Sequence, residues 1–296
     1  MNYRLVVDGG GTSTRAVVAD AAGHIVARGL AGPGNLAVQP REAWLAAVLA
    51  AVREACAQLP GTSAGTPRFT RVWVGAAGIN DAADERAAAG LLEQALSYEH
   101  LSVTNDAALL CAPDVGAACV VAVAGTGSVV QAYGPGVACK RALAARIGGL
   151  GWLLGDEGSA YGIGREALRA ALDGETSMHA AICAVWGVRE SETLLARVYA
   201  PGDAKARIAA LSPVVIHGAA RGEPAALRIV DKETERLAAQ IVRAYAALNH
   251  RAILSLGGAL VHEPVYQAAL LRHVGSLPWL RVDAISDAAA CAARAT

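Results

Sequence analysis

The sequence predicts an α/β protein made of two duplicated βββαβα domains around a central cleft. A glycine-rich turn between two apolar strands occurs twice, at Asp8–Ser13 and at Gly125–Ser128. The strands and helices expected around the two turns follow the same order. The chain has 296 residues, of which 54% are apolar, and this is enough to fill two hydrophobic cores. We place the domains at residues 1–115 and 116–296.

The first domain is expected to fold in the order βββαβαβ. Short runs rich in valine, alanine and leucine predict its strands, and Asp20–Gly23 has the composition of a hairpin turn. Pro40 suits the start of a helix, because proline needs no hydrogen-bond partner there. The expected strands are Tyr3–Val7, Arg15–Ala19, His24–Leu30, Arg71–Gly75 and Leu101–Thr104, and the expected helices are Glu42–Leu59, Ala82–Leu96 and a short one from Ala107.

The second domain repeats this order with a long helical insertion. Its glycine-rich turn again separates two apolar strands, and a Gly257-Gly258 turn follows a later strand. We expect strands at Ala118–Ala124, Val129–Tyr133, Val137–Ala144 and Ala252–Leu256, a mostly helical stretch over Ser159–Asn249, a helix from Pro264, and a closing strand and helix.

Both glycine-rich turns predict phosphate binding. Glycine reaches backbone conformations that other residues avoid, and it lets main-chain N–H groups close on a phosphate oxygen. Two facing turns would hold one polyphosphate from both sides. No Walker-type GxxxxGK[ST] motif is present, so any nucleotide is expected to be held by this pair of turns. The predicted phosphate ligands are Gly10, Gly11, Thr12 and Ser13 in the first domain and Gly125, Thr126 and Gly127 in the second.

Asp8 is the candidate metal ligand. It lies at the carboxyl end of an apolar strand, where open α/β sheets place their ligands, and directly before three glycines. Mg²⁺ prefers oxygen ligands and keeps much of its water, so Asp8 is expected to hold the Mg²⁺ of a bound nucleotide, usually through water. The alternative is that Asp8 only caps a tight turn. The presence of a second glycine-rich turn favours the interpretation of Asp8 as a metal ligand.

Three further carboxylates have two interpretations each. Asp106 follows a short strand and precedes an alanine-rich helix, so it suits either a proton acceptor for a hydroxyl or a helix N-cap. Asp156 and Glu157 lie between glycines at the start of a helix. They either interact with the helix dipole or accept hydrogen bonds from neighbouring hydroxyl groups.

The composition argues against nucleic-acid and membrane partners. Lys+Arg and Asp+Glu are equal at 26 each, so there is no basic field. No apolar run reaches the roughly 18 residues of a spanning helix. The six cysteines contain no CxxC pair and lie in apolar or alanine-rich stretches, which is typical of a reducing, cytoplasmic compartment.

Five motifs together carry a family resemblance. They are DGGGTST from Asp8, Gly34-Asn35, TNDAA around Asp106, AGTGS from Ala124 and GDEGSAY from Gly155. The paired turns resemble the actin, hexokinase and Hsp70 superfamily, whose domains are ribonuclease H-like, or actin-like ATPase, folds. The full set, in this order, resembles the N-acetylglucosamine kinase branch, which is grouped with bacterial glucosamine kinases and BadF/BcrA-type ATPases.

The resemblance implies a function and roles for individual residues. It implies ATP, Mg²⁺ and a small amino-sugar substrate, phosphorylated at its 6-hydroxyl with Asp106 as the general base. Asn35 and Asp156 match sugar-binding residues, with Glu157 beside them, and Gly257 and Gly258 match the turn against adenosine. The sugar and phosphate side falls in the first domain and the adenosine side in the second. A homodimer is implied as well.

Departures from the family pattern leave the substrate open. Leu150 and Gly162 stand where relatives carry tryptophan, and the role of Trp152 is undecided between sugar contact and core. Glucosamine therefore remains an alternative to N-acetylglucosamine, and N-acetylmuramic acid is a more distant one. The zinc-binding cysteine motif of ROK sugar kinases is absent.

A BadF-type activator, which couples ATP hydrolysis to electron transfer through an iron–sulfur cluster, is the second hypothesis. The cysteines expected of such a cluster are not seen, because no cysteine lies beside a glycine-rich helix start. A sugar-responsive regulator is disfavoured, because the first strand is expected by Tyr3, with no room for a helix-turn-helix before it.

Overall fold

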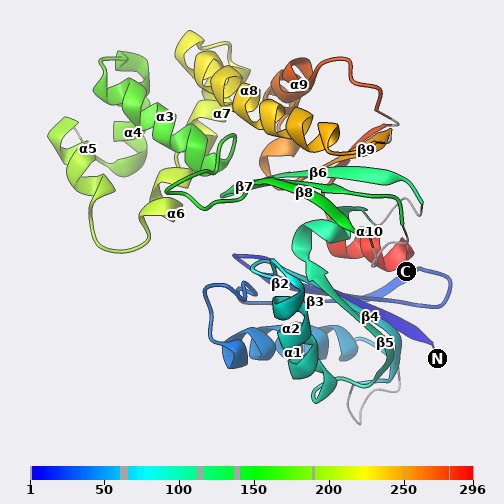
Figure 1. Ribbon diagram of the computed structural model, residues 1–296. Coiled ribbons are helices and arrows are strands. Elements are labelled where there is room, and N and C mark those ends of the chain that lie inside the picture. The colour runs from blue at the N-terminus through cyan, green and yellow to red at the C-terminus, as the bar shows by residue number, and fades with distance from the viewer. Residues whose placement is uncertain are drawn as a thin grey trace. The chain divides into compact units, whose positions relative to one another are not determined.

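The structure, a computed structural model, describes residues 2–60, 66–111, 116–136, 141–188, 191–249, 251–279 and 281–295. The chain divides into two compact units (Figure 1). Unit 1 comprises Met1–Val121, Tyr133–Ala142 and Asp287–Thr296, and unit 2 comprises Ala122–Ala132 and Leu143–Ser286.

The first sheet has five strands in the order β3-β2-β1-β4-β5. The pairs β1–β2 and β2–β3 are antiparallel, whereas β1–β4 and β4–β5 are parallel. The parallel pairs place the carboxyl ends of β1, β4 and β5 at the same edge of the sheet, which is where the site described below lies. The bounds are β1 Tyr3–Gly9, β2 Thr14–Ala19, β3 Ile25–Ala31, β4 Phe69–Ala76 and β5 Tyr98–Asn105.

Helices cover both faces of this sheet. On one face α1 (Arg41–Cys56) buries Trp44, Val48 and other apolar side chains against the strands. α2 (Ala82–Glu93) packs on β5, and Asp81 caps it by accepting from the N–H groups of Ala83 and Asp84. α10 (Ala288–Ala295) packs on β1, β2 and the short 3-10 helix η1 (Asp106–Cys111).

The contact between β3 and α1 depends on Gly29. A Cβ atom at this position would lie 1.9 Å from the carbonyl oxygen of Ala51 in α1, which is far inside van der Waals contact. Gly29→Ala is therefore expected to push α1 off the sheet and to lower the free energy of unfolding by about 3 kcal/mol. Urea unfolding checks this, with Gly32→Ala as the control, because a Cβ on Gly32 meets nothing within 4 Å. Equal stability of the two variants would contradict the packing.

The second sheet has the strand order β10-β9-β6-β7-β8. Read from the β8 edge, this is the same order as in the first sheet read from β3. Each strand has a counterpart at the same place, since β6, β7 and β8 correspond to β1, β2 and β3, and β9 and β10 correspond to β4 and β5. The duplicated βββαβα fold class is thereby confirmed at the level of strand order. The bounds are β6 Ala118–Ala124, β7 Ser128–Tyr133, β8 Leu143–Gly148, β9 Ala252–Gly257 and β10 Val282–Ile285.

The expected helical stretch between β8 and β9 is confirmed. Helix α3 packs on α4 and α6, and α8 packs on α7 and α9. The 23-residue helix α8 also packs on β8. The bounds are α3 Ala160–Leu172, α4 Thr176–Trp186, α5 Ser191–Val198, α6 Ala204–Ala209, α7 Ser212–Ala220, α8 Pro224–Ala246, η3 Leu260–His262 and α9 Pro264–Val274. In the described part of the chain, no helix combines the length and the hydropathy needed to cross a membrane.

Two expectations differ from the structure. The strand expected at Val137–Ala144 falls partly on residues 137–140, which lie outside the described residues, and the described strand β8 runs from Leu143 to Gly148. The expected domains, 1–115 and 116–296, assign residues 133–142 and the segment from Asp287 to the second half. Both segments group with unit 1, and α10 does so because its alanine-rich face packs on β1 and β2.

Candidate functional site

Two carboxylate residues, Asp8 and Asp106, lie at the carboxyl edge of the first sheet, close enough for the charge of Asp106 to raise the pKa of Asp8. Asp8 is paired with Gly75 in the β1–β4 register, and Asp106 directly follows β5, the next strand. A Cβ on Gly75 would lie 3.2 Å from Cα of Asp106 and 2.6 Å from the Leu109 side chain. The missing side chain at Gly75 therefore leaves space for the Leu109 side chain and for the backbone of Asp106 at the start of η1.

The environment of Asp8 disfavours its negative charge. Burial raises the pKa of Asp8 to about 7, the nearby charge of Asp106 adds to this, Arg15 opposes it and Asp287 contributes a smaller rise. A carboxylate with such a pKa takes up either a proton or a cation at neutral pH. The donor set of two neighbouring carboxylates fits Mg²⁺, which prefers oxygen ligands. Among the described residues, no group of three or more His, Cys, Asp or Glu side chains could hold a metal by itself.

Asp106 also has a local role. Its Oδ1 accepts a hydrogen bond from the backbone N–H of Ala107 at 2.9 Å, and Asn105 Oδ1 accepts from the same N–H at 3.1 Å. Asp106 is thus the first residue of η1, and its charge also acts on Asp8. Its role as a proton acceptor stays a prediction.

The loop that carries Asn35 is fastened to the first glycine-rich turn. The Gly34 N–H donates to the Gly10 carbonyl oxygen at 2.9 Å, and Asn35 Oδ1 accepts from the Ala37 N–H at 2.9 Å. Gly78, at φ +87°, lies so close that a Cβ there would be 2.6 Å from Asn35 Oδ1. The turn itself is open, since Gly11 and Thr12 are exposed. The Gly34–Gly10 hydrogen bond thus joins the Asn35 loop to the first glycine-rich turn. Unit 1 contains seven of the predicted site residues, which are Asp8, Gly10, Gly11, Thr12, Ser13, Asn35 and Asp106.

The second glycine-rich turn is built on the start of α3. The Ala160 N–H donates to the Gly125 carbonyl at 2.9 Å and the Tyr161 N–H donates to the Thr126 carbonyl at 3.2 Å, so the turn satisfies N–H groups of the first helical turn. Gly258, at φ +92°, lies directly beside it, and a Cβ there would be 2.4 Å from the Ala124 carbonyl oxygen. The predicted phosphate turn, Gly125–Gly127, and the predicted adenosine turn, Gly257-Gly258, are therefore neighbours in unit 2.

Asp156 is buried beside this turn with its carboxylate engaged. Oδ1 accepts from the Ser128 N–H at 3.1 Å, and Oδ2 forms an ion pair with Lys205 Nζ at 2.8 Å. The backbone of Asp156 is left-handed, with φ 64°, which is uncommon for a residue with a side chain. A Cβ on Gly127 would lie 2.7 Å from Oδ1, so the turn needs glycine there.

The side chain of Glu157 contacts different residues from those that surround the neighbouring Asp156. Its Oε2 accepts from Gln240 Nε2 on α8 at 2.9 Å. Glu157 and Gln240 line a cavity of about 450 Å³ together with three arginines, Arg165, Arg236 and Arg243. The two neighbouring acids of the GDEG segment therefore face different surroundings.

The positions that depart from the family pattern have distinct environments. Leu150 is exposed, and Trp152 packs edge-on against Tyr161 with ring centroids 5.7 Å apart. Gly162 lies inside α3, where a Cβ would be 2.3 Å from Glu233 Oε2. An aromatic side chain at position 162 would meet Glu233, so glycine there has a packing reason that is independent of any ligand.

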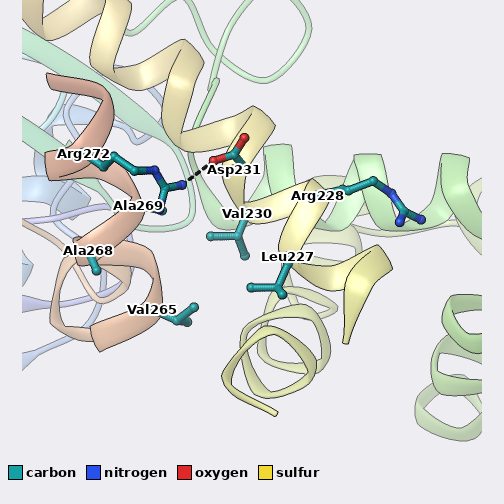
Figure 2. A pocket seen from close by; sticks show the side chains of 8 residues that line it. All are labelled: Leu227, Arg228, Val230, Asp231, Val265, Ala268, Ala269 and Arg272. Carbon is teal, nitrogen blue, oxygen red and sulfur yellow. Dashed lines mark hydrogen bonds and ion pairs between the residues drawn. The ribbon is translucent and has the colours of Figure 1, made fainter. Parts of the chain in front are cut away.

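A separate cavity of about 390 Å³ lies at α8 and α9, and it contains none of the predicted site residues (Figure 2). Figure 2 shows Arg272 reaching Asp231 through an ion pair, while Arg228 points away from them. Arg228 pairs with Glu175 instead. Of the charged residues that line this cavity, Asp231 and Arg272 pair with each other, whereas the partner of Arg228 lies outside the lining.

Sequence reasoning missed Gly75 and Lys205. Gly75 ends a run that predicts an ordinary strand, and only the register of β1, β4 and β5 shows what it makes room for. Lys205 lies far along the chain from Asp156 in the helical insertion, and no motif links the two. No disulfide joins any two of the five cysteines in the described ranges, and Cys139 lies outside the described residues.

The chain belongs to the BadF/BadG/BcrA/BcrD ATPase family, whose model matches residues 5–277. The family predicted from the motifs is therefore confirmed. The N-acetylmuramic acid/N-acetylglucosamine kinase of Clostridium acetobutylicum is 25% identical over 296 residues, covering 97% of this chain and 94% of its own.

Solved structures show the same fold. A protein of Chromobacterium violaceum, proposed to be an N-acetylglucosamine kinase, matches with a TM-score of 0.73 at 25% identity over 99% of this chain and 98% of its own. A ROK family glucokinase of Streptomyces griseus, solved with glucose and AMPPNP, matches with a TM-score of 0.62 at 17% identity over 99% and 97%. The prediction of a duplicated actin-like ATPase fold is confirmed.

Proposed function

We propose that this protein is an ATP-dependent kinase that phosphorylates the 6-hydroxyl of an N-acetylated amino sugar, most simply N-acetylglucosamine. The observation that carries the proposal is the placement of Asp8 and Asp106 at the same edge of the first sheet, where burial and the charge of Asp106 raise the pKa of Asp8. One carboxylate for the metal and one for the hydroxyl proton are what phosphoryl transfer to an alcohol needs.

Unit 1 supplies the groups that act on the hydroxyl. Asp106 accepts the proton of the sugar hydroxyl as the phosphoryl group moves, and Asn35, held by the Gly34–Gly10 hydrogen bond, orients the sugar. Gly10, Gly11, Thr12 and Ser13 donate to the terminal phosphates. Mg²⁺, bound to ATP and held by Asp8 through water, would neutralise charge on the phosphates.

Unit 2 supplies the groups for the rest of the nucleotide. Gly125, Thr126 and Gly127 bind phosphate oxygens, and Gly257 and Gly258 pack against adenosine. Support comes from the close approach of Gly258 to Ala124, which brings the Gly257-Gly258 turn next to the Gly125–Gly127 turn. One nucleotide needs its phosphate turn and its adenosine turn to be neighbours. Asp156 and Glu157 complete the set at the start of α3. Cytoplasmic location and homodimerisation stay predictions from the sequence.

Two alternatives remain. Glucosamine differs from N-acetylglucosamine only at the amine, and the exposed Leu150 provides no ring for an acetyl group. A BadF-type activator is the alternative that the family assignment itself favours, because the family is named for ATPases. An activator would carry an iron–sulfur cluster and hydrolyse ATP without any sugar.

The test is a coupled ADP-release assay with Mg·ATP against N-acetylglucosamine, glucosamine, N-acetylmuramic acid, glucose and no sugar. We expect strong turnover with an N-acetylated amino sugar and weak turnover without sugar. The phosphorylated product should carry its phosphate at the 6-position by NMR. ADP release that is the same with every sugar and without one would replace the kinase by an ATPase, and visible absorbance of the purified protein would then favour the activator.

A further inference from the structure

Three arginines line one cavity of unit 2. Arg165 lies on α3, whereas Arg236 and Arg243 lie two helical turns apart on α8, and α3 and α8 pack on each other. The cavity has a volume of about 450 Å³, within the range of roughly 300 to 1,000 Å³ that small-molecule sites occupy. Glu157 and Gln240 complete its polar lining. Every lining residue belongs to unit 2, so the cavity is a feature of that unit alone.

Two of the three guanidinium groups carry charge that the protein leaves uncompensated. Arg243 forms no ion pair or hydrogen bond within the described part of the chain. Arg165 Nε is buried without a hydrogen-bond partner among the described residues, and the carboxylate oxygen that it approaches, Glu166 Oε1, is 3.9 Å away. That oxygen already pairs with Arg169 at 2.8 Å and with Arg236 at 3.5 Å. Arg165 and Arg243 can therefore donate to an anion in the cavity.

The wall of the cavity is fixed by a buried acid. Glu233 is fully buried, and its Oε1 pairs with Arg236 at 2.6 Å while its Oε2 accepts from the Gly158 N–H at 2.7 Å. One carboxylate thus ties α8 to the start of α3. Since the arginines lie on two helices that are fastened to each other, the cavity is preformed, and little freedom of the backbone is lost when a ligand binds.

The other charged group of the lining is a hydrogen-bond acceptor. Glu157 Oε2 accepts from Gln240 Nε2 at 2.9 Å, and Oε1 has no partner in the described ranges. A carboxylate oxygen accepts hydrogen bonds from hydroxyl groups, and it repels an anion. The lining therefore offers donors for an anionic group at the arginines and an acceptor for a hydroxyl group at Glu157.

We propose that this cavity binds a phosphomonoester of a hydroxylated compound, such as a sugar phosphate. Arg165 and Arg243 bind the phosphate oxygens, because guanidinium groups donate paired, charge-assisted hydrogen bonds to phosphate, and Glu157 accepts from a hydroxyl group of the same ligand. The site is additional to the two predicted phosphate turns, since none of their residues lines the cavity. The inference rests on this cavity and does not depend on the proposed function.

Calorimetry in the absence of ATP, at one fixed ionic strength, compares wild type with Arg243→Met and with the double variant Arg165→Met, Arg243→Met. The ligands are glucose 6-phosphate, inorganic phosphate and glucose. We expect the dissociation constant of glucose 6-phosphate to rise roughly ten- to hundredfold in Arg243→Met, as for a lost charge-assisted hydrogen bond, and further in the double variant. Arg243→Lys keeps the charge and should give a smaller rise. Inorganic phosphate has no sugar hydroxyl group and should bind wild type more weakly, and the binding of glucose should be the same in all variants.

Arg221→Met is the matched control, because Arg221 is another exposed arginine of unit 2 and pairs with Glu223 outside the cavity. It should leave every dissociation constant unchanged. Equal affinity of wild type and the double variant for glucose 6-phosphate would overturn the inference and assign the phosphate to the glycine-rich turns. A wild type that binds no phosphate compound would overturn it too, and equal binding of inorganic phosphate and glucose 6-phosphate would overturn the part of Glu157. No ATP is turned over here, so failure of this site and failure of the kinase are separate results. Circular dichroism checks that each variant is folded.

Discussion

Asp106→Asn is expected to lower turnover by roughly two to four orders of magnitude, because an amide cannot accept the proton of the sugar hydroxyl. Asparagine has the same shape, and its Oδ1 can still accept from the Ala107 N–H, so η1 should keep its first turn. The affinity for the sugar should be nearly unchanged. Steady-state kinetics gives turnover, and calorimetry gives the dissociation constant of the sugar.

Asp81→Asn is the matched control in the same unit. Asp81 also precedes a helix and accepts from the N–H groups of Ala83 and Asp84, and asparagine is as good an N-cap as aspartate. Its turnover should stay close to that of wild type. If Asp106→Asn behaved like Asp81→Asn, Asp106 would be a cap of η1 and the general base would have to be another residue.

Asp8→Asn is expected to inactivate the enzyme and to stabilise the fold at the same time. Loss of the metal ligand should lower turnover with Mg·ATP by roughly two orders of magnitude. The effect on stability comes from the pKa of Asp8, which rises from 3.8 to about 7 on folding. A group whose pKa is raised by folding contributes most to stability below its unfolded pKa, and that contribution is lost as the pH rises through the folded pKa.

The gain in stability should therefore depend on pH. Above about pH 7 the variant should exceed wild type by on the order of 2 to 4 kcal/mol, since three pKa units correspond to roughly 4 kcal/mol. The difference should disappear near pH 4. Urea unfolding at several pH values measures it. Asp20→Asn is a control of opposite sign, because hydrogen bonds from His24 and Ala22 lower the pKa of Asp20. A less stable Asp8→Asn at about pH 8 would show that the charge of Asp8 is not disfavoured.

Local patterns predict the strands and turns well, because each depends on residues close together in the chain. The apolar run before Asp8 and the glycines after it are sufficient for β1 and its turn. The strand expected at Val137–Ala144 shows the limit, because alanine-rich runs with few β-branched residues mark strand ends poorly. The described part of that segment enters β8 only at Leu143.

The surroundings of the site residues depend on register and on distant packing. The motif before Asp106 cannot show that Gly75 lies under it, because that follows from the pairing of β1, β4 and β5. The motif containing Asp156 leaves a helix-dipole role and a hydroxyl-binding role open, and it does not show that the carboxylate is buried in an ion pair with Lys205 of α6. Motifs identify which residues matter, whereas long-range packing decides which charge a ligand meets.

The packing of α10 on β1 and β2 affects how the protein folds during translation. Arg28 of β3 forms an ion pair with Asp287, at the start of α10, across 259 positions of sequence. The first sheet is synthesised early, yet the face that carries Val6 and Val17 lacks this cover until residues 288–295 emerge. During translation unit 1 is therefore incomplete and exposes apolar surface. Exposed apolar surface of this kind is what chaperones bind.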